Sequence, residues 1–339
     1  MIKKLIYRNA ALKNLKKLQY ASGLFGASKH KVSTGYNKAW VRDNIYEALG
    51  LESVQDLEGL KKVYSALFDI LLKHEFKIDH AIQKKPEHKH EYIHARYDPI
   101  NFHEFHEEWG NKQNDAVGAF LFKVADLLNK GIMVIRDKND LRILQKLVHY
   151  LGSIEYWHDN DNGMWEENEE VHASSVGACL AGLKAISKYV DVPSSFIEKG
   201  QTTLNVLLPR ESLTKQTDLA LLSLIYPYNI VSRRQKEQIL HNVETLLVKN
   251  KGVLRYIGDQ YYNKNGHEAE WTMGFPWLAK IFLDVGDRDK YNFYMKKTYE
   301  CFNQKGEMPE LYFGKTEQHN ENSPLGWSHA LAIVAMAEA

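Results

Sequence analysis

Residues 173–180 read ASSVGACL, an uncharged run of small and apolar side chains. Residues 116–121, which read AVGAFL, have the same character. A helix without a polar face is typical of a protein interior, because no side of it is suited to water. Both stretches therefore predict helices that are buried on most sides.

A second class of predicted helix is apolar on one side only. In the segment 54–74, apolar residues that include Leu60, Tyr64 and Leu67 form one helical stripe, and charged residues lie off it. Ser232 is suited to cap the N-terminus of another such helix. Half-exposed helices are predicted near 2–19, 54–74, 139–151, 194–207, 232–249 and 288–303, and buried helices near 43–51, 112–129, 170–189, 217–226, 269–285 and 325–338.

The two classes of helix alternate along the chain, and the connections alternate with them. Connections that leave a buried helix are short, whereas those that leave a half-exposed helix are mostly long. Because successive helices of a compact α domain usually run antiparallel, the long connections should gather at one end. This pattern predicts an all-α fold, an (α/α)6 barrel of about twelve helices in a single domain over residues 1–339. An α-solenoid is the alternative, but it would need a repeat of about 34–45 residues, which the sequence does not contain.

The composition points to a soluble enzyme or binding protein. The net charge of +1 argues against nucleic acid or an anionic membrane as the main partner. Cys179 and Cys301 are the two cysteines, so no disulfide framework is implied. The first residues carry too much charge for a signal peptide, and no stretch is apolar for long enough to span a bilayer. We therefore expect a cytoplasmic protein.

The seven tryptophans favour a pocket for a ring-shaped ligand. They lie in the long connections or early in the helices that follow them, rather than in the middle of the half-exposed helices. The flat apolar face of an indole suits the stacking of a sugar ring. The tryptophans in connections are Trp40, Trp109, Trp157 and Trp165, and those early in helices are Trp271, Trp277 and Trp327.

Residues 159–167, which read DNDNGMWEE, bring an indole and two carboxyl groups together in a turn-rich loop. A carboxyl group held against an apolar surface tends to keep its proton, which suits a general acid. The alternative is that Trp165 fills the core beside a solvated pair, Glu166 and Glu167. From this loop alone, both interpretations stay open.

Other connections end in polar residues beside aromatic ones. Arg42 and Asp43 at a helix start could bind neighbouring sugar hydroxyls, although Asp43 could instead cap its helix and pair with Arg42. Gln113 and Asp115 would help to cap the next helix whatever else they do. Five histidines between residues 88 and 106 lack the spacing of a zinc motif, so no metal is predicted.

As an ordered set, residues 40–43 (WVRD), 165–167 (WEE), 255–256 (RY) and 324–328 (PLGWS) resemble the motifs of glycoside hydrolase family 15, the glucoamylase family. The resemblance covers nearly the whole chain, and its motifs are strong together and weak one at a time. Residues 109–115 and 268–271 also look like the related glucoamylase-like domain of phosphorylase kinase α and β subunits. That kinship implies an (α/α)6 barrel.

This resemblance also implies roles. Glu166 matches the general acid and Glu310 the general base of a reaction that releases glucose with inversion from the non-reducing end of α-glucosides. Such a pair should stand roughly 6.5–9.5 Å apart. No cofactor is implied, and the expected partner is an oligosaccharide. The candidate substrate-binding residues are Tyr36, Trp40, Arg42, Asp43, Trp109, Gln113, Asp115, Trp165, Glu167, Arg255, Tyr256 and Trp327.

The sequence also departs from the family pattern. Leu311 follows Glu310 where glucoamylases usually have Gln, and Glu317 is a second candidate for the base. The 339 residues match the barrel without an N-terminal β-sandwich or a starch-binding module, so we expect short soluble oligosaccharides rather than granular starch as substrates. The phosphorylase kinase likeness leaves a non-catalytic glucan-binding or regulatory domain as the alternative function.

Overall fold

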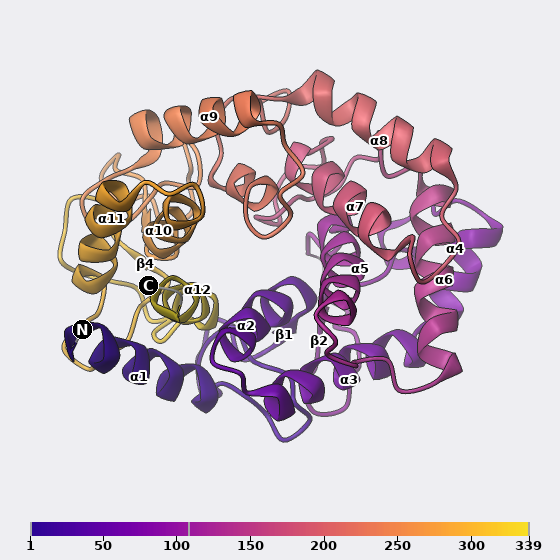
Figure 1. The fold of residues 1–339 in the computed structure, drawn as a ribbon, viewed down its shortest axis with the longest axis horizontal. Coiled ribbons are helices and arrows are strands. Elements are labelled where there is room, and N and C mark those ends of the chain that lie inside the picture. Colours follow the sequence, from indigo (N-terminus) through magenta and orange to yellow (C-terminus); the bar gives the residue numbers. More distant parts are fainter. Residues whose placement is uncertain (1, 108, 338–339) are drawn as a thin grey trace.

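The structure is a computed structural model that describes residues 2–107 and 109–337, and its helices form two concentric rings (Figure 1). The inner ring contains α2 (Val41–Ser53), α5 (Asn114–Asn129), α7 (Ala173–Ile186), the short 3-10 helix η2 (Leu219–Leu224), α10 (Gly274–Asp284) and α12 (Gly326–Ala337). The outer ring contains α1 (Ile2–Lys17), α3 (Leu57–Lys73), α6 (Lys138–Ile154), α8 (Ser194–Leu207), α9 (Arg233–Asn242) and α11 (Arg288–Glu300).

The inner ring is closed. Each inner element contacts the next inner element along the chain, and α12 returns to contact α2. The first and last units of an α-solenoid would stand apart, so this closure excludes the solenoid. The predicted (α/α)6 barrel is confirmed.

The contact between α5 and α7 explains why residues 173–180 are so small. A β-carbon added to Gly118 would lie 2.4 Å from the backbone of Ala178, and one added to Gly182 would lie 2.5 Å from the carbonyl oxygen of Gly118. Glycine is needed where two backbones approach this closely. The uncharged stretches therefore encode two helices that pack backbone against backbone inside the ring.

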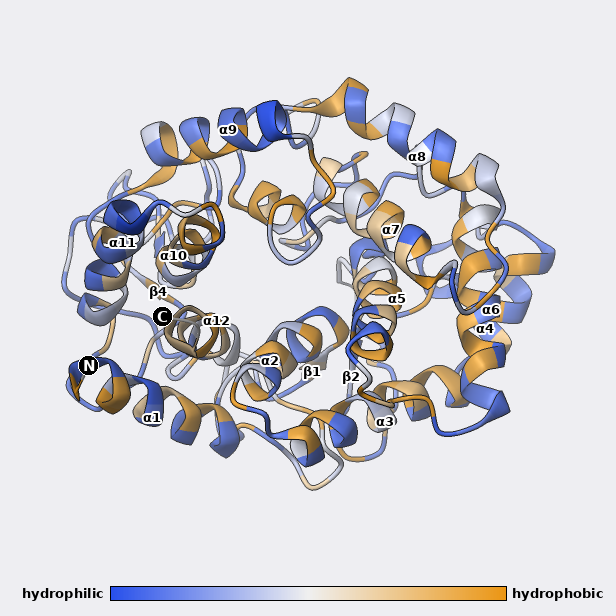
Figure 2. Cartoon of the chain, viewed as in Figure 1, coloured by the Kyte–Doolittle hydropathy of each residue, from blue (hydrophilic) through white to orange (hydrophobic). Residues whose placement is uncertain are grey.

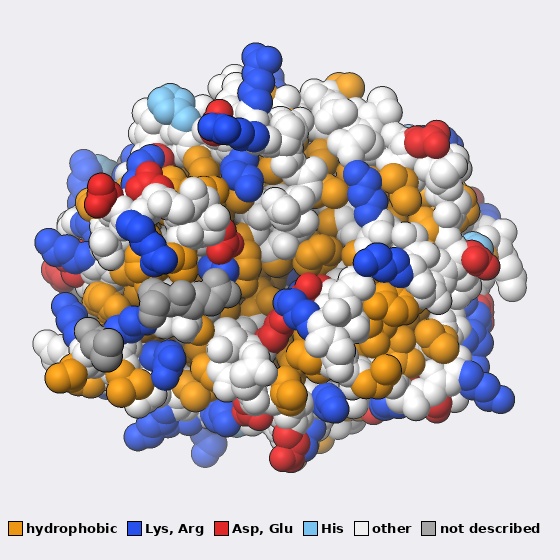
Figure 3. All heavy atoms as spheres, viewed as in Figure 1, with side chains coloured by type: hydrophobic (Ala, Val, Ile, Leu, Met, Phe, Trp, Pro, Cys, Tyr) orange, Lys and Arg blue, Asp and Glu red, His pale blue; other side chains and the backbone are white. Residues whose placement is uncertain are grey.

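The outer helices follow the predicted one-sided pattern. Their hydrophobic residues face the inner ring and their hydrophilic residues face outward (Figure 2). Asp56 caps α3 through the N–H of Gly59, and Ser232 forms a capping box with Gln235 at the start of α9. Charged side chains of both signs cover the rim of the molecule, and hydrophobic side chains show near the centre of the ring (Figure 3).

The segment 217–226 was wrongly predicted to be an α-helix, because only the 3-10 helix η2 forms there. Asp218 caps its start by accepting from the N–H of Ala220. Pro227 disfavours helical geometry in Tyr226, which precedes it. The inner ring is therefore at its shortest at this position.

The connection predicted at 75–111 contains a further helix, α4 (Glu75–Gln83), and a 3-10 turn, η1 (Lys89–Glu91). Helix α4 follows α3 after His74 and packs against α6, burying Ile78 and Ala81. Its apolar pattern is weak because Phe76 faces solvent. A short π-helical turn, η3 (Val243–Leu247), continues α9.

Two pairs of very short strands link the long connections. Strand β1 (Ala39–Trp40) pairs antiparallel with β2 (Arg96–Tyr97), and β3 (Glu270–Trp271) pairs antiparallel with β4 (Leu311–Tyr312). Few strand signals are present in the sequence, because each strand has only two residues. In the part of the chain that the structure describes, no helix combines the length and the apolar character needed to cross a bilayer.

Candidate active site

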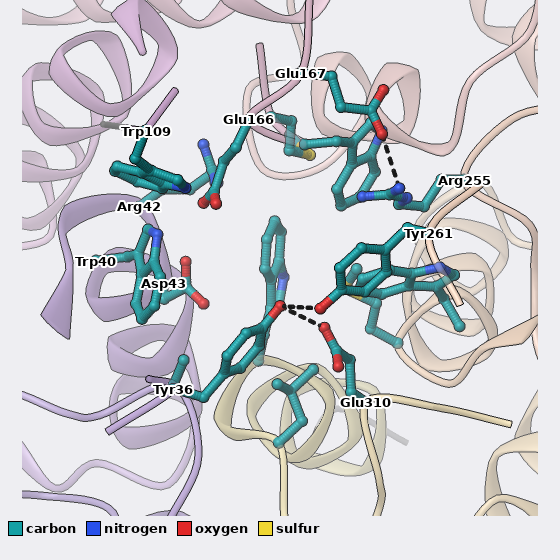
Figure 4. A pocket seen from close by; sticks show the side chains of 17 residues that line it. Tyr36, Trp40, Arg42, Asp43, Trp109, Glu166, Glu167, Arg255, Tyr261 and Glu310 are labelled. Atoms are coloured by element: carbon teal, nitrogen blue, oxygen red, sulfur yellow. Dashed lines mark hydrogen bonds and ion pairs between the residues drawn. The ribbon is translucent and has the colours of Figure 1, made fainter. Parts of the chain in front are cut away.

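The long connections enclose a pocket of about 250 Å³ at one end of the barrel (Figure 4). Glu166 and Glu310 both line it and lie on opposite sides of it. Its lining combines aromatic rings with a few charged groups, as small-molecule pockets commonly do. The lining residues are Ala27, Tyr36, Trp40, Arg42, Asp43, Trp109, Met164, Trp165, Glu166, Glu167, Arg255, Tyr261, Trp271, Met273, Glu310, Leu325 and Trp327.

The loop that carries Glu166 is tied down on both sides. The indole N–H of Trp165 donates to Asp218 at 2.7 Å, which anchors the loop to η2. The N–H of Asn162 donates to the carbonyl oxygen of Lys112 at 2.8 Å, which anchors the loop beside α5. Glu166 itself has a φ of +64°, a conformation that non-glycine residues rarely adopt. Such a residue keeps this geometry only when its surroundings hold it there.

Glu166 has the electrostatics of a general acid. Burial raises the pKa of its carboxyl group to about 7, and Asp43 adds to the rise. Arg42 opposes the shift from 3.6 Å, measured between Nη2 and Oε1. The side chain keeps 23% of its surface exposed and lines the pocket. The carboxyl group therefore stays substantially protonated near neutral pH and remains accessible.

Glu310 stands across the pocket in a different environment, with no surface exposed. Its Oε1 accepts a hydrogen bond from the hydroxyl of Tyr36 at 2.7 Å. Its Oε2 accepts from the side-chain amides of Asn320 and Asn322. Burial raises the pKa of Glu310 above its ordinary value, and these three donors oppose the rise. The donors orient the carboxylate and favour its ionised form.

Arg42 and Asp43 lie in the first turn of α2, where both line the pocket. Arg42 donates from Nη1 to Gln113 at 2.8 Å and pairs with Asp115 at 3.1 Å. The carboxyl group of Asp43 does not cap α2, which begins after Trp40 without a side-chain cap. Burial raises the pKa of Asp43 to about 6. The pair thus presents a fixed cation and a carboxyl group to the pocket.

Glu167 belongs to a second charged cluster. It accepts from Arg255 at 2.8 Å, from Lys215 at 2.7 Å and from the hydroxyl of Tyr256 at 2.7 Å. Although burial opposes it, these partners lower the pKa of Glu167. Arg255 is held in turn by Asp259, which it contacts at 2.7 and 2.6 Å. The adjacent residues Glu166 and Glu167 therefore differ in charge near neutral pH.

Five of the seven tryptophans line the pocket. Trp165 lies near Trp271 and Trp327, with ring centroids 5.7 and 6.3 Å apart, and Trp40 lies 6.0 Å from Trp109. The other two do not reach it. Trp277 is buried in α10 and donates to the carbonyl oxygen of Tyr226, and Trp157 packs against Phe196. The prediction of an aromatic pocket is thus met by most of these residues.

Nine of the twelve predicted binding residues line the pocket, and three stand behind it. Gln113 and Asp115 hold Arg42, and Tyr256 holds Glu167, so these three support residues of the lining instead of facing it. Tyr261 and Trp271 also line the pocket and were not among the twelve, although Trp271 is one of the tryptophans expected near it. Both lie beside aromatic or acidic residues in the connection after Arg255, and that clustering was the available signal.

The second candidate for the base lies elsewhere. The side chain of Glu317 is 76% exposed and pairs with Lys251 at 2.6 Å, outside the pocket. The histidines between residues 88 and 106 also form no ligand cluster. Within residues 2–107 and 109–337, no three His, Cys, Asp or Glu side chains are grouped so that they could hold a metal ion.

Comparison with known sequences identifies a family and finds relatives among regulatory subunits of phosphorylase b kinase. The family model of glycosyl hydrolases family 15 matches residues 2–204. The chain is 25% identical over 336 residues to a probable phosphorylase b kinase regulatory subunit alpha of Caenorhabditis elegans, with 81% of this chain and 27% of that protein covered. It is 25% identical over 264 residues to the skeletal muscle isoform of that subunit from Oryctolagus cuniculus, with 66% of this chain and 21% of that protein covered. The chain therefore spans only 21–27% of the length of these two relatives.

Solved structures share the fold across nearly the whole chain. A wild-type glycosidase superposes with a TM-score of 0.84 at 17% identity, covering 98% of this chain and 96% of that chain. A variant of a glycosidase in complex with glucose superposes with a TM-score of 0.81 at 18% identity, with the same coverage. A bacterial glucoamylase complexed with acarbose gives a TM-score of 0.70 at 16% identity, covering 98% of this chain and 55% of that chain. At these identities the likeness shows the barrel fold.

Proposed function

The chain belongs to glycosyl hydrolase family 15, since the family model matches more than half of it. From this premise we propose that it is an inverting, exo-acting hydrolase that releases glucose from the non-reducing end of short α-gluco-oligosaccharides. One observation carries the proposal: two carboxyl groups with different surroundings, Glu166 and Glu310, lie on opposite sides of one aromatic pocket.

Glu166 acts as the general acid. Its pKa, raised to about 7, lets it keep a proton that it can give to the leaving glycosidic oxygen. As the bond breaks, the carboxyl group becomes a carboxylate, and Arg42 at 3.6 Å stabilises the charge that develops. An acid that is too strong would lose its proton before the reaction, which is why burial is needed here.

Glu310 acts as the general base. Its carboxylate is oriented by Tyr36, Asn320 and Asn322, and it accepts a proton from a water molecule that attacks the opposite face of the sugar. The water becomes the new hydroxyl of glucose while the leaving oxygen receives the proton of Glu166. Inversion needs a carboxyl separation of roughly 6.5–9.5 Å, so that this water fits between base and sugar.

The pocket favours a terminal sugar over the middle of a chain. Its volume of about 250 Å³ lies below the 300–1,000 Å³ of most ligand pockets. Arg42 and Asp43 supply a donor and an acceptor for sugar hydroxyls, and Trp40, Trp165 and Trp327 supply apolar faces. The glucose and acarbose bound by proteins of the same fold support a carbohydrate ligand.

A second candidate function is a regulatory domain that binds glucan without cleaving it. The observation in its favour is the sequence similarity to regulatory alpha subunits of phosphorylase b kinase. A carboxyl pair could bind hydroxyl groups and perform no chemistry. The two functions differ in whether any glycosidic bond is broken.

The deciding experiment is to incubate the protein with maltose, isomaltose, nigerose and trehalose and to follow glucose and its anomer by NMR. We expect β-glucose to appear first from at least one substrate, and we expect Glu166→Gln and Glu310→Gln to abolish its release. Retention of the anomer, or a normal rate in either variant, would refute the mechanism. Binding of the sugars without cleavage of any of them would establish the regulatory alternative.

A further inference from the structure

The side-chain amide of Gln113 is buried and is hydrogen-bonded through both its nitrogen and its oxygen. Gln113 is the residue before α5, yet its side chain makes no capping bond to that helix. Its Nε2 instead donates to the carbonyl oxygen of Gly110 at 2.8 Å. Its Oε1 accepts from Nη1 of Arg42, also at 2.8 Å. With 4% of the residue exposed, the amide bridges two segments that lie far apart in the sequence.

Both partners of Gln113 touch Glu166. On the main-chain side, a β-carbon added to Gly110 would lie 2.7 Å from the carbonyl oxygen of Glu166. On the side-chain side, Nη2 of Arg42 lies 3.6 Å from Oε1 of Glu166. One amide therefore connects the residue packed on the backbone of Glu166 with the cation that faces its carboxyl group.

This bridge matters because Glu166 is in a conformation that needs support. Its φ of +64° lies in the left-handed region, which is strained for a non-glycine residue. Gly110 covers the peptide of Glu166 closely, and the position of Gly110 depends in part on the bond from Gln113. Loss of that bond should let the peptide relax and turn the carboxyl group away from its working position.

The neutral charge of Gln113 matters as well. Arg42 already pairs with Asp115 and faces Glu166. An amide oxygen holds the guanidinium in place without adding a negative charge that would compete with Glu166 for it. The charged and titratable groups that face Glu166 are Arg42 and Asp43 from α2, Arg96 from β2 and the hydroxyl of Tyr36. Gln113 is not one of these groups, so any effect of Gln113 on the titration of Glu166 is transmitted through Arg42 and Gly110.

We propose that Gln113 is a positioning residue that fixes both the backbone of Glu166 and the guanidinium that faces its carboxyl group. The proposal rests on the proposed function in taking Glu166 as the acid of the reaction. It differs from the expectation that Gln113 binds substrate, because Gln113 does not line the pocket. It also differs from a capping role, because the amide makes no cap.

The test compares two variants. Gln113→Glu keeps an acceptor for Arg42, loses the donor to Gly110 and adds a charge, whereas Gln113→Met loses both bonds at similar volume. Asn14→Met is the matched control, because Asn14 is also a buried amide that donates to a glycine carbonyl, that of Gly306, outside the pocket. Two measurements are made on each: kcat and KM against pH, and the titration of Glu166 by ¹³C NMR, assigned with Glu166→Gln.

We expect Gln113→Glu to move the titration of Glu166, and the alkaline limb of kcat, upward by about half a pH unit or more. We expect Gln113→Met to lower kcat at least about tenfold with a smaller change in KM. Asn14→Met should change only thermal stability. If both Gln113 variants titrate as the wild type does, or lose activity only in step with stability, the inference is wrong.

The NMR titration separates this inference from the proposed function. A protein that hydrolyses no glucoside but whose Glu166 titration moves in Gln113→Met, which adds no charge, would refute the proposed function and leave the positioning role standing. A protein that hydrolyses glucosides through Glu166 but is unaffected by both Gln113 variants would refute the positioning role alone.

Discussion

The hydroxyl of Tyr36 donates to Oε1 of Glu310 at 2.7 Å and lies 3.0 Å from the hydroxyl of Tyr261. The carboxylate thereby receives a donor from the pocket side in addition to the two asparagine amides behind it. Because this bond favours the ionised form of Glu310, the tyrosine lowers the pKa that burial raises. The hydrogen bond from Tyr36 thus favours the charged form of a carboxyl group that has no exposed surface.

Replacing Tyr36 with Phe should weaken the base at low pH. Without the hydroxyl, the pKa of Glu310 rises further, so the carboxylate is protonated at a higher pH and the acid limb of kcat/KM moves upward. We expect kcat to fall about tenfold to a hundredfold. Tyr261→Phe is the control, since Tyr261 contacts Tyr36 and makes no hydrogen bond to Glu310. An acid limb that stays in place in Tyr36→Phe would contradict this account.

Replacing Glu166 with Gln should remove activity and yet stabilise the fold at neutral pH. The pKa of Glu166 is raised to about 7 in the folded chain, against about 4.3 in an unfolded chain. Between these values the folded state binds more protons than the unfolded state, so its free energy of unfolding falls as pH rises. The amide side chain in the Glu166→Gln variant does not titrate, so it causes no such fall in the free energy of unfolding.

The advantage of Glu166→Gln over the wild type should therefore grow between about pH 4 and pH 7, by an amount on the order of 1–3 kcal/mol. Urea unfolding across this range measures it. Glu317→Gln is the control, because that carboxyl group is exposed outside the pocket. A difference that does not change with pH would show that folding does not raise the pKa of Glu166.

Lys215→Met should weaken substrate binding at the side of the pocket where Glu167 lies. The substitution removes a 2.7 Å ion pair and raises the pKa of Glu167, which loses one of its cations. If Arg42 and Asp43 bind the terminal glucose, the side of the pocket where Glu167 lies contacts the next sugar. We expect KM for a disaccharide to rise about threefold to tenfold while inhibition by glucose stays unchanged. Lys199→Met, beside Trp157 and away from the pocket, should change neither value.

Gly118→Ala tests the packing of the inner ring. The added carbon would lie 2.4 Å from the backbone of Ala178. To relieve this overlap, two packed helix backbones would have to move apart, at a high cost in free energy. We expect a loss of roughly 3 kcal/mol or more in the free energy of unfolding, or an insoluble product. Gly131→Ala meets no atom within 4 Å but has a φ of +76°, so it should cost only about 1 kcal/mol of backbone strain. Equal losses would show that space at Gly118 is not limiting.

The two rings of helices could be predicted from the sequence, because buried helices and half-exposed helices differ in amino-acid composition. The buried helix α7 consists mostly of small and apolar side chains, whereas α3 is apolar on one side only. The alternation of these two helix types along the chain can be seen without knowing how the helices pack. Helix α4 and the 3-10 geometry of η2 were not predicted, because the local sequence signals were weak for α4 and misleading for η2. The exposed Phe76 blurs the stripe of α4, and the apolar run of η2 is cut short by the following Tyr226 and Pro227.

The candidate acid and base were found because their neighbours in sequence, Trp165 before Glu166 and the loop around Glu310, form recognisable motifs. Gln113, Asp115 and Tyr256 were expected in the lining but stand behind it. Residue type and loop position cannot separate a residue that contacts a ligand from one that holds such a residue, because both are polar and both lie in the same connections. That distinction depends on side-chain direction, which the fold determines.

The close packing of α5 on α7 has a mechanical consequence. The connection that carries Glu166 leads into α7, and the segment with Gly110 and Gln113 leads into α5, so Glu166 and the segment packed on its backbone continue into two closely packed helices. Glu310 lies instead directly before β4, which pairs with β3, and the N–H of Thr272 donates to its carbonyl oxygen. A small movement of α5 and α7 relative to this strand pair would change the gap across the pocket. The separation of the two carboxyl groups is thus set by the whole ring, and substitutions far from the pocket can alter it.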